Sequence, residues 1–208
     1  MRIEVLDFGI NNTRSVTSAY SAFEGCEVEI VESAANSKGS NLLILPGVGN
    51  FGQAVSAIQA RGFDAMIRDS AAKKTKILGI CLGMQLLGTE SEESPGVRGL
   101  DLIPGRTKKL PLEDFEYIPN VGWSGISQDS PEGLLSREIH GDFYFVHSYY
   151  FKPDSSENVI FSSNYGKFNF ASGIQNENIA GVQFHPEKSS STGHQFLKNS
   201  LEWAIAKN

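Results

Sequence analysis

The segment best suited to chemistry is a cysteine between two glycines, Gly79-Ile80-Cys81-Leu82-Gly83, between an apolar run and a helical pattern. This is the spacing of a nucleophile elbow, a tight strand-to-helix turn whose neighbouring residues must be almost free of side chains. A thiol at the start of a helix is favoured as thiolate by the helix dipole, and the Leu82 N–H can donate to an oxyanion. Since a free cysteine is otherwise a small buried hydrophobe, the flanking glycines are what predict that Cys81 is a nucleophile.

A cysteine nucleophile requires a base, and the base requires an orienting group. Of the four histidines, His185 has the most suggestive context, because it ends an apolar run and is followed by Pro186 and Glu187. Proline favours extended backbone before it, and residues two apart in extended chain face the same side. Glu187 is therefore predicted to orient the His185 imidazole. His140 and His194 lack this context and are expected to be ordinary core or surface residues.

A third segment, Leu43-Ile44-Leu45-Pro46-Gly47-Val48-Gly49, is a buried strand pattern that ends in Pro-Gly-x-Gly. Glycines at that point let the backbone approach a ligand and supply N–H groups to an oxyanion. Taken alone, the same residues also fit a simple turn after a strand.

Strand-like and helix-like patterns alternate in the first half of the chain. Strands are predicted at 3–7, 27–32, 42–45 and 76–81, and helices at 13–23, 53–58, 63–67 and 82–87, with Asn12 as N-cap of the first helix. Such alternation predicts right-handed βαβ units and a mostly parallel sheet.

The second half is richer in strand patterns, and the chain closes with a helix. Strands are predicted at 143–151, 159–163, 168–174 and 179–184, and an amphipathic helix at 192–207. Closely spaced strands favour antiparallel or mixed pairing. The prediction is therefore a single α/β domain over residues 1–208, with a mostly parallel central sheet and a β-rich second half.

Composition excludes several classes of protein. The chain has 208 residues, 24 of them acidic and 18 basic, whereas nucleic-acid and membrane-surface binders carry a basic excess. Two cysteines build neither a disulfide framework nor a zinc site, and a reducing compartment is the simpler inference. Acidic residues interrupt the first apolar residues, so no signal peptide is expected. A cytoplasmic protein without metal or cofactor is the expectation.

Together the three motifs resemble the class I, triad-type glutamine amidotransferases in order and spacing over nearly the full length. The resemblance implies a three-layer α/β fold in which Cys81 attacks the side-chain amide of glutamine, His185 transfers the proton and Glu187 orients His185. It also implies that the N–H groups of Val48 and Leu82 bind the oxyanion. The matching glutamine-pocket positions are Gly47, Gly49, Gln85, Glu93, His147, Ser148 and Tyr149.

Within this family, the segments are most similar to glutaminase subunits of imidazole glycerol phosphate synthases. That similarity implies a heterodimer in which ammonia passes through a protected route to a (β/α)₈ cyclase. The cyclase makes imidazole glycerol phosphate and an aminoimidazole carboxamide ribotide, so the role is in histidine biosynthesis. Positions matching or neighbouring the subunit interface are Asn120, Trp123, Tyr144 and Lys188.

Three positions depart from the usual pattern of these subunits, namely Asn11, Asn120 and Ser124. All three fall in segments expected near the partner face, whereas the predicted triad is intact. An alternative is thus a related subunit that supplies ammonia for amidination of a bacterial surface sugar. Two alternatives from other classes are a stand-alone γ-glutamyl hydrolase or peptidase and a silent glutamine-binding module.

Overall fold

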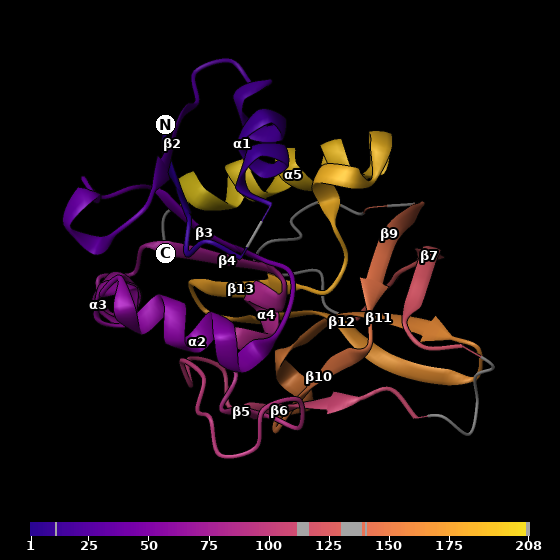
Figure 1. The fold of residues 1–208 in the computed structure, drawn as a ribbon. Coiled ribbons are helices and arrows are strands. Elements are labelled where there is room, and N and C mark those ends of the chain that lie inside the picture. The colour runs from indigo at the N-terminus through magenta and orange to yellow at the C-terminus, as the bar shows by residue number, and fades with distance from the viewer. Residues whose placement is uncertain (11, 112–116, 130–138, 140, 207–208) are drawn as a thin grey trace.

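A mixed sheet of eight strands runs through the centre of the molecule in the order β2-β1-β3-β4-β13-β12-β11-β8 (Figure 1). The computed structural model describes residues 1–10, 12–111, 117–129, 139 and 141–206. The strands from β2 to β13 pair in parallel, and β12, β11 and β8 continue the sheet in antiparallel pairing. The predicted fold class, mostly parallel at its centre and β-rich in its second half, is confirmed.

The strands of this sheet come from both halves of the chain. Their bounds are β1 Arg2–Leu6, β2 Glu27–Val31, β3 Leu42–Gly47, β4 Lys76–Cys81, β8 Ser127–Gln128, β11 Val159–Tyr165, β12 Phe168–Asn176 and β13 Ile179–Val182. The helices are α1 Thr13–Ser21, α2 Phe51–Ala60, α3 Phe63–Ala72, α4 Leu82–Leu86 and α5 Ser190–Ile205. Short 3₁₀ turns occupy Ala34–Asn36, Ser156–Asn158 and Pro186–Lys188.

Alternate residues of the parallel strands face opposite sides of the sheet, and each side is covered by its own helices. Helices α1 and α5 lie on one face, and α2, α3 and α4 on the other (Figure 1). On β3, for example, Leu42 and Ile44 pack in the core under α1 and α5, whereas Leu43 and Leu45 pack in the core under α2–α4. These helices and the sheet give the three layers expected.

The second half departs from the sequence prediction in two places. The run predicted as one strand over 143–151 is divided at Ser148 into β9 (Asp142–His147) and β10 (Tyr149–Pro153). Strand β9 pairs with β7 (Asn120–Gly125), and β10 joins a small sheet with β6 (Gly105–Lys109) and β5 (Glu90–Ser91). The predicted strand 179–184 ends at Val182, because the chain turns there toward the 3₁₀ turn.

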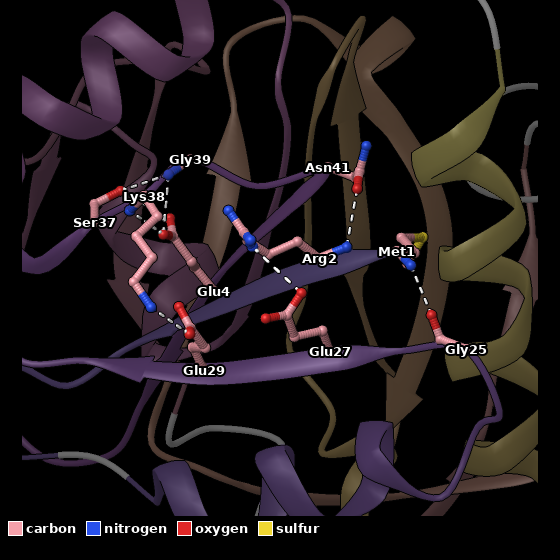
Figure 2. Close-up of polar contacts among 10 residues, drawn as sticks. All are labelled: Met1, Arg2, Glu4, Gly25, Glu27, Glu29, Ser37, Lys38, Gly39 and Asn41. Atoms are coloured by element: carbon pink, nitrogen blue, oxygen red, sulfur yellow. Dashed lines mark hydrogen bonds and ion pairs between the residues drawn. The ribbon is translucent and has the colours of Figure 1, made fainter.

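Hydrogen bonds from a connecting loop secure the N-terminal strands at one end of the sheet (Figure 2). The buried Glu4 carboxylate on β1 accepts hydrogen bonds from the Ser37 hydroxyl and the Lys38 and Gly39 N–H groups, at 2.9, 2.8 and 3.1 Å. The Lys38 ammonium forms an ion pair with Glu29 of β2 at 2.7 Å. The loop between β2 and β3 is therefore tied to both β1 and β2. Among the described helices, none is long and apolar enough to cross a membrane.

The C-terminal ends of three adjacent parallel strands form the edge that carries the predicted chemistry. Gly47 at the end of β3 is in register with Cys81 at the end of β4. On the other side of β4, Val182 of β13 is in register with Ile80, so the residues after Val182 emerge beside Cys81. In open α/β sheets, ligands bind in the crevice at the carboxyl ends of the strands.

Candidate active site

Cys81 occupies a strained turn between β4 and α4. Its φ of 56° and ψ of −110° place it outside the regions that side-chain-bearing residues favour. Such strain persists only where the surrounding structure enforces it, and it occurs at functional sites more often than elsewhere. Cys81 is 6% exposed and borders a cavity. The geometry is that of the predicted nucleophile elbow.

The glycines on either side of Cys81 are required by close backbone contacts. A Cβ atom on Gly79 would lie 2.6 Å from the carbonyl of Gly83, and one on Gly83 would collide with the Leu45 carbonyl oxygen. A Cβ atom on Gly47 would lie 2.9 Å from the side chain of Leu82. Gly47 thus allows α4 to start close to β3, but it does not line the cavity, contrary to its prediction as a glutamine-pocket residue.

His185 and Glu187 form a buried pair directly beside the turn. His185 Nδ1 lies 2.9 Å from Glu187 Oε1, and both side chains are almost fully buried. Burial by itself lowers the pKa of His185, but the interactions with Cys81 and Glu187 outweigh it and raise the pKa to about 10. His185 Nε2 has no hydrogen-bond partner among the described residues. The imidazole is therefore held by Glu187 on one side and has its other nitrogen available on the cysteine side.

A cavity of about 320 Å³ opens in front of the Cys81 thiol. Its lining includes most of the predicted glutamine-pocket residues, both predicted oxyanion donors and Cys81 itself. Two residues that were not predicted, Pro119 and Val146, also line it. The full lining is Val48, Gly49, Cys81, Leu82, Gln85, Glu93, Pro119, Val146, His147, Ser148 and Tyr149. Segments far apart in the sequence, including the β3–α2 loop, α4 and the β9–β10 junction, thus converge on one cavity.

Two side chains of the cavity wall, the Glu93 carboxylate and the His147 imidazole, already form hydrogen bonds within the chain. Glu93 Oε2 accepts a hydrogen bond from the Phe51 N–H at 2.7 Å, which places this carboxylate at the start of α2. His147 lies between the Tyr149 carbonyl oxygen, 2.9 Å from Nδ1, and the Asn120 side chain, 3.1 Å from Nε2. Asn120 is therefore buried behind the cavity wall, and its side chain is not on the exposed surface expected for an interface residue.

The two predicted oxyanion donors differ in their present surroundings. Leu82 begins α4, directly after Cys81. The Val48 N–H donates to the Ile10 carbonyl oxygen at 3.4 Å, and the following residue, Gly49, has a φ of +98°. The Val48 N–H is thus occupied by a contact within the chain.

Three of the predicted interface residues lie together on the surface. The Trp123 and Tyr144 rings meet edge to face with centroids 5.9 Å apart, and the Lys188 ammonium lies 6.0 Å from the Tyr144 centroid. Trp123 is 54% exposed and Val121, two residues before it on β7, is 55% exposed. This cluster places large apolar surface next to the 3₁₀ turn that contains Glu187.

Sequence reasoning missed Gln183, whose Nε2 lies 3.6 Å from the Cys81 sulfur. A signal was available, because Gln183 is a polar residue in an apolar run and precedes His185 by two positions. His194, expected to be ordinary, stacks on Phe23 at 4.5 Å, and Asn11 and His140 lie outside the described residues. No group of three or more His, Cys, Asp or Glu side chains that could hold a metal occurs in the part of the chain described.

Comparison with known proteins places this geometry in a family. Residues 4–203 match the family model of glutamine amidotransferase class-I. The chain is 44% identical over 199 residues to imidazole glycerol phosphate synthase subunit HisH of Moorella thermoacetica, covering 95% of this chain and 92% of the relative. It is 39% identical to the subunit of the same name from Chlorobaculum tepidum, covering 96% and 98% of the two chains.

Solved structures show the same fold at much lower sequence identity. A chain in the structure of PurLQS from Thermotoga maritima superposes with a TM-score of 0.76 at 18% identity, covering 97% of this chain and 98% of the other. The glutaminase domain of Trypanosoma brucei CTPS, solved with bound acivicin, superposes with a TM-score of 0.61 at 14% identity, covering 100% and 95%.

Proposed function

The chain belongs to the class I glutamine amidotransferases, glutamine-hydrolysing enzymes, and on this premise we propose that Cys81, His185 and Glu187 carry out the hydrolysis. The single observation that carries this assignment is the strained Cys81 turn at the cavity, with the buried His185–Glu187 pair beside it. In this arrangement the base is held by its orienting group beside the nucleophile, and the nucleophile borders a cavity large enough for an amino acid.

The reaction proceeds in two steps. The Cys81 sulfur attacks the side-chain carboxamide carbon of glutamine, and His185 takes the thiol proton and delivers it to the departing ammonia. This leaves a thioester, which water hydrolyses to glutamate while His185 takes one proton from the water and returns one to the sulfur. Cys81 and Glu187, acting against burial, raise the pKa of His185 to about 10, so they stabilise the imidazolium that forms when His185 takes the thiol proton.

Glutamine is held by the predicted pocket residues around the cavity. The Glu93 carboxylate suits the α-ammonium group of glutamine, and Gly49, Gln85, His147, Ser148 and Tyr149 line the same space. The oxyanion is bound by the Leu82 N–H and the Val48 N–H. Because the Val48 N–H now donates to Ile10, its peptide must turn before it can serve as a donor. We therefore expect slow turnover in the isolated chain; turnover as fast as in a complex would exclude this step.

The proposed biological role is the glutaminase subunit of an imidazole glycerol phosphate synthase in histidine biosynthesis. The similarity to the HisH subunits of Moorella thermoacetica and Chlorobaculum tepidum supports it. Ammonia is passed to a (β/α)₈ cyclase subunit docked on the exposed surface around Trp123, Tyr144 and Lys188. Delivery through a protected route keeps ammonia unprotonated and nucleophilic.

The alternative role in surface-sugar amidination depends on three residues that depart from the family pattern near the expected partner face. Two of them make contacts within the chain, which gives less support to a changed partner. The Asn120 side chain is buried against His147, and the Ser124 hydroxyl donates to the Asn164 carbonyl oxygen at 3.3 Å. Both side chains thus serve contacts within the chain. The third departure, Asn11, lies outside the described residues.

The decisive experiment is glutamine hydrolysis by the chain with the histidine-pathway cyclase of the same genome and the cyclase's nucleotide substrate. Cys81→Ser should abolish hydrolysis while leaving the thermal unfolding midpoint nearly unchanged, since the change is almost isosteric. Cys26→Ser is the matched control, because Cys26 is the other free cysteine and should be dispensable. Retained hydrolysis in Cys81→Ser would refute the nucleophile, and absence of stimulation by the cyclase would refute the proposed partner.

A further inference from the structure

Gln183 lies beside Cys81 because of the pairing of the two central strands. Strands β13 and β4 run parallel with Val182 opposite Ile80, so the next residues of each, Gln183 and Cys81, leave the sheet side by side. The Gln183 N–H is bonded to the Ser172 carbonyl oxygen of β12 at 2.9 Å, which fixes its backbone. Its side chain is fully buried, so each of its polar atoms needs a partner inside the protein.

The orientation of the Gln183 amide follows from a chain of hydrogen bonds that starts at a backbone carbonyl. The Tyr149 carbonyl oxygen can only accept, so the Gln85 side-chain atom 3.1 Å away is its NH₂ group. The same NH₂ group lies 3.0 Å from the Gln183 side chain, which must therefore present its oxygen to Gln85. The Gln183 NH₂ group is then left to face the Cys81 sulfur, 3.6 Å away.

We propose that Gln183 is a positioning residue that donates a hydrogen bond to the Cys81 sulfur and stabilises its thiolate. The inference rests on the proposed role of Cys81 as nucleophile. A hydrogen bond to a charged acceptor is stronger than one to a neutral acceptor, so this donor favours the ionised sulfur. Because Gln85 and Tyr149 lock the amide, the donor is in place before glutamine binds and needs no rearrangement during the reaction.

The remaining groups around the sulfur have different roles. The Val146 carbonyl oxygen, 4.0 Å from the sulfur, can only accept and so cannot stabilise a thiolate. The titratable residues that reach this site or line its cavity are Glu93, His147, Tyr149, His185 and Glu187. Among these, His185 supplies a positive charge next to the sulfur when protonated, whereas Gln183 is a neutral donor whose own protonation state does not change with pH.

The test measures how fast Cys81 is alkylated by iodoacetamide as a function of pH, with each cysteine followed by peptide mass. Two variants change the group that faces the sulfur. Gln183→Met removes the donor, and Gln183→Glu keeps the shape and the oxygen facing Gln85 but places a second oxygen against the sulfur. Cys26 in the same molecule is an internal control, and Ser172→Ala is a matched variant, because its hydroxyl bonds to Ser163 and not to Cys81.

We expect the pH profile of Cys81 alkylation to change in both Gln183 variants, and to change more in Gln183→Glu than in Gln183→Met. In Gln183→Met, the Cys81 alkylation rate at pH 7 falls about tenfold and its pH midpoint rises by about one unit, the size expected for a lost hydrogen bond to a charged group. In Gln183→Glu the midpoint rises further, because a carboxylate repels the thiolate. Cys26 in every variant, and both cysteines in Ser172→Ala, keep their original profiles. Equal profiles for Cys81 in the original chain and both Gln183 variants would overturn the proposal.

A measurement on the unaltered chain covers the case in which the variants do not fold. The side-chain ¹H–¹⁵N signals of Gln183 should shift with the same pH midpoint as Cys81 alkylation, and should change when Cys81 is alkylated. Side-chain signals of Asn178, which donates to the Ala71 and Thr75 carbonyls, should not respond. Unresponsive Gln183 signals would refute the inference alone, whereas retained hydrolysis by Cys81→Ser would refute the proposed function.

Discussion

Asn120 and His147 face each other across the β7–β9 pair, with Asn120 Nδ2 3.1 Å from His147 Nε2. The other ring nitrogen, Nδ1, lies 2.9 Å from the Tyr149 carbonyl oxygen, which can only accept. Nδ1 must therefore carry the proton, and Nε2 accepts from the Asn120 amide. This arrangement requires a neutral ring, and it connects β7, which carries the exposed Trp123, to the wall of the cavity in front of Cys81.

The neutral His147 predicts a loss of stability in acid. Burial, together with the positive charge of His185, lowers the pKa of His147 to about 4 despite the bond to Tyr149. In the unfolded chain a histidine takes up its proton near pH 6.5, so acidification from pH 6.5 to 4 favours the unfolded state. We expect this group to cost on the order of 2 kcal/mol between pH 7 and pH 4.5, measured by urea unfolding.

Replacement of His147 by glutamine should remove this part of the acid sensitivity, since an amide does not titrate in this range. The unfolding free energy of His147→Gln should therefore fall less between pH 7 and pH 4.5 than that of the original chain. His194→Gln is the matched control, because His194 is exposed. If the unfolding free energy of His147→Gln falls between pH 7 and pH 4.5 as much as that of the His194→Gln control, the neutral-ring assignment is wrong.

The His185–Glu187 pair leads us to predict that the unfolding free energy also declines at alkaline pH. His185 has its pKa raised to about 10 because the Cys81 sulfur and the Glu187 carboxylate beside it outweigh the effect of burial. A raised histidine pKa stabilises the fold below the unfolded value near 6.5, and this contribution is lost as pH rises through about 10. Glu187→Gln should flatten the decline of unfolding free energy between pH 7 and pH 10 and lower glutamine turnover by about 100-fold or more. Glu157→Gln, on an exposed turn, should alter neither.

The surface cluster predicts where the partner binds. Trp123→Ala removes a half-exposed ring that packs edge to face on Tyr144, and large aromatic side chains carry much of the binding energy of interfaces. We expect the dissociation constant for the cyclase to rise about tenfold or more, measured by titration calorimetry, with a nearly unchanged unfolding midpoint. The control is Tyr117→Ala, also strongly exposed but without a ring contact among the described residues. Equal affinities for the original chain and Trp123→Ala would move the interface elsewhere.

Much of the fold could be predicted because local pattern and final environment agree. Leu42–Leu45 and Ile77–Ile80 are apolar on both faces, and in the structure helices cover both faces of these strands. The division at Ser148 could not be predicted, because the residues on either side have equal strand character. What separates β9 from β10 is the pairing of each with a different distant strand, and such pairing leaves no local signal.

The candidate site shows the same limit. The sequence singles out Cys81, His185 and Glu187 because each stands in a local motif whose chemistry can be stated, and the structure brings all three to the same edge of the sheet. Gln183 was missed, because its role depends on the register between β13 and β4 and on the Gln85 amide. Asn120 was expected near the partner face, and only the pairing of β7 with β9 reveals that it faces His147.

The close packing of the turn around Cys81 predicts that Gly83 cannot be replaced even by alanine without a large loss of stability. A Cβ atom there would collide with the Leu45 carbonyl oxygen, which belongs to the neighbouring buried strand and cannot move without disturbing the sheet. We expect Gly83→Ala to cost about 3 kcal/mol or more of unfolding free energy and to abolish hydrolysis. In Gly125→Ala, the added methyl meets only an Asp142 oxygen at 3.6 Å, an ordinary contact. A Gly83→Ala chain as stable as Gly125→Ala would show that the turn is looser than described.

The hydrogen bonds of the Glu4 carboxylate are predicted to stabilise the loop between β2 and β3 by a measurable amount of unfolding free energy. Its buried carboxylate accepts from Ser37, Lys38 and Gly39, so Glu4→Leu leaves these donors without their acceptor (Figure 2). We expect a loss of about 2–4 kcal/mol in urea unfolding. Glu4→Gln should cost far less, because its oxygen can still accept from both N–H groups and its amide can donate to the Ser37 hydroxyl. Glu29→Leu breaks only an ion pair whose lysine is largely exposed and should cost much less unfolding free energy than Glu4→Leu. If Glu4→Leu and Glu29→Leu are equally stable, the loop is held by its packing and not by the carboxylate.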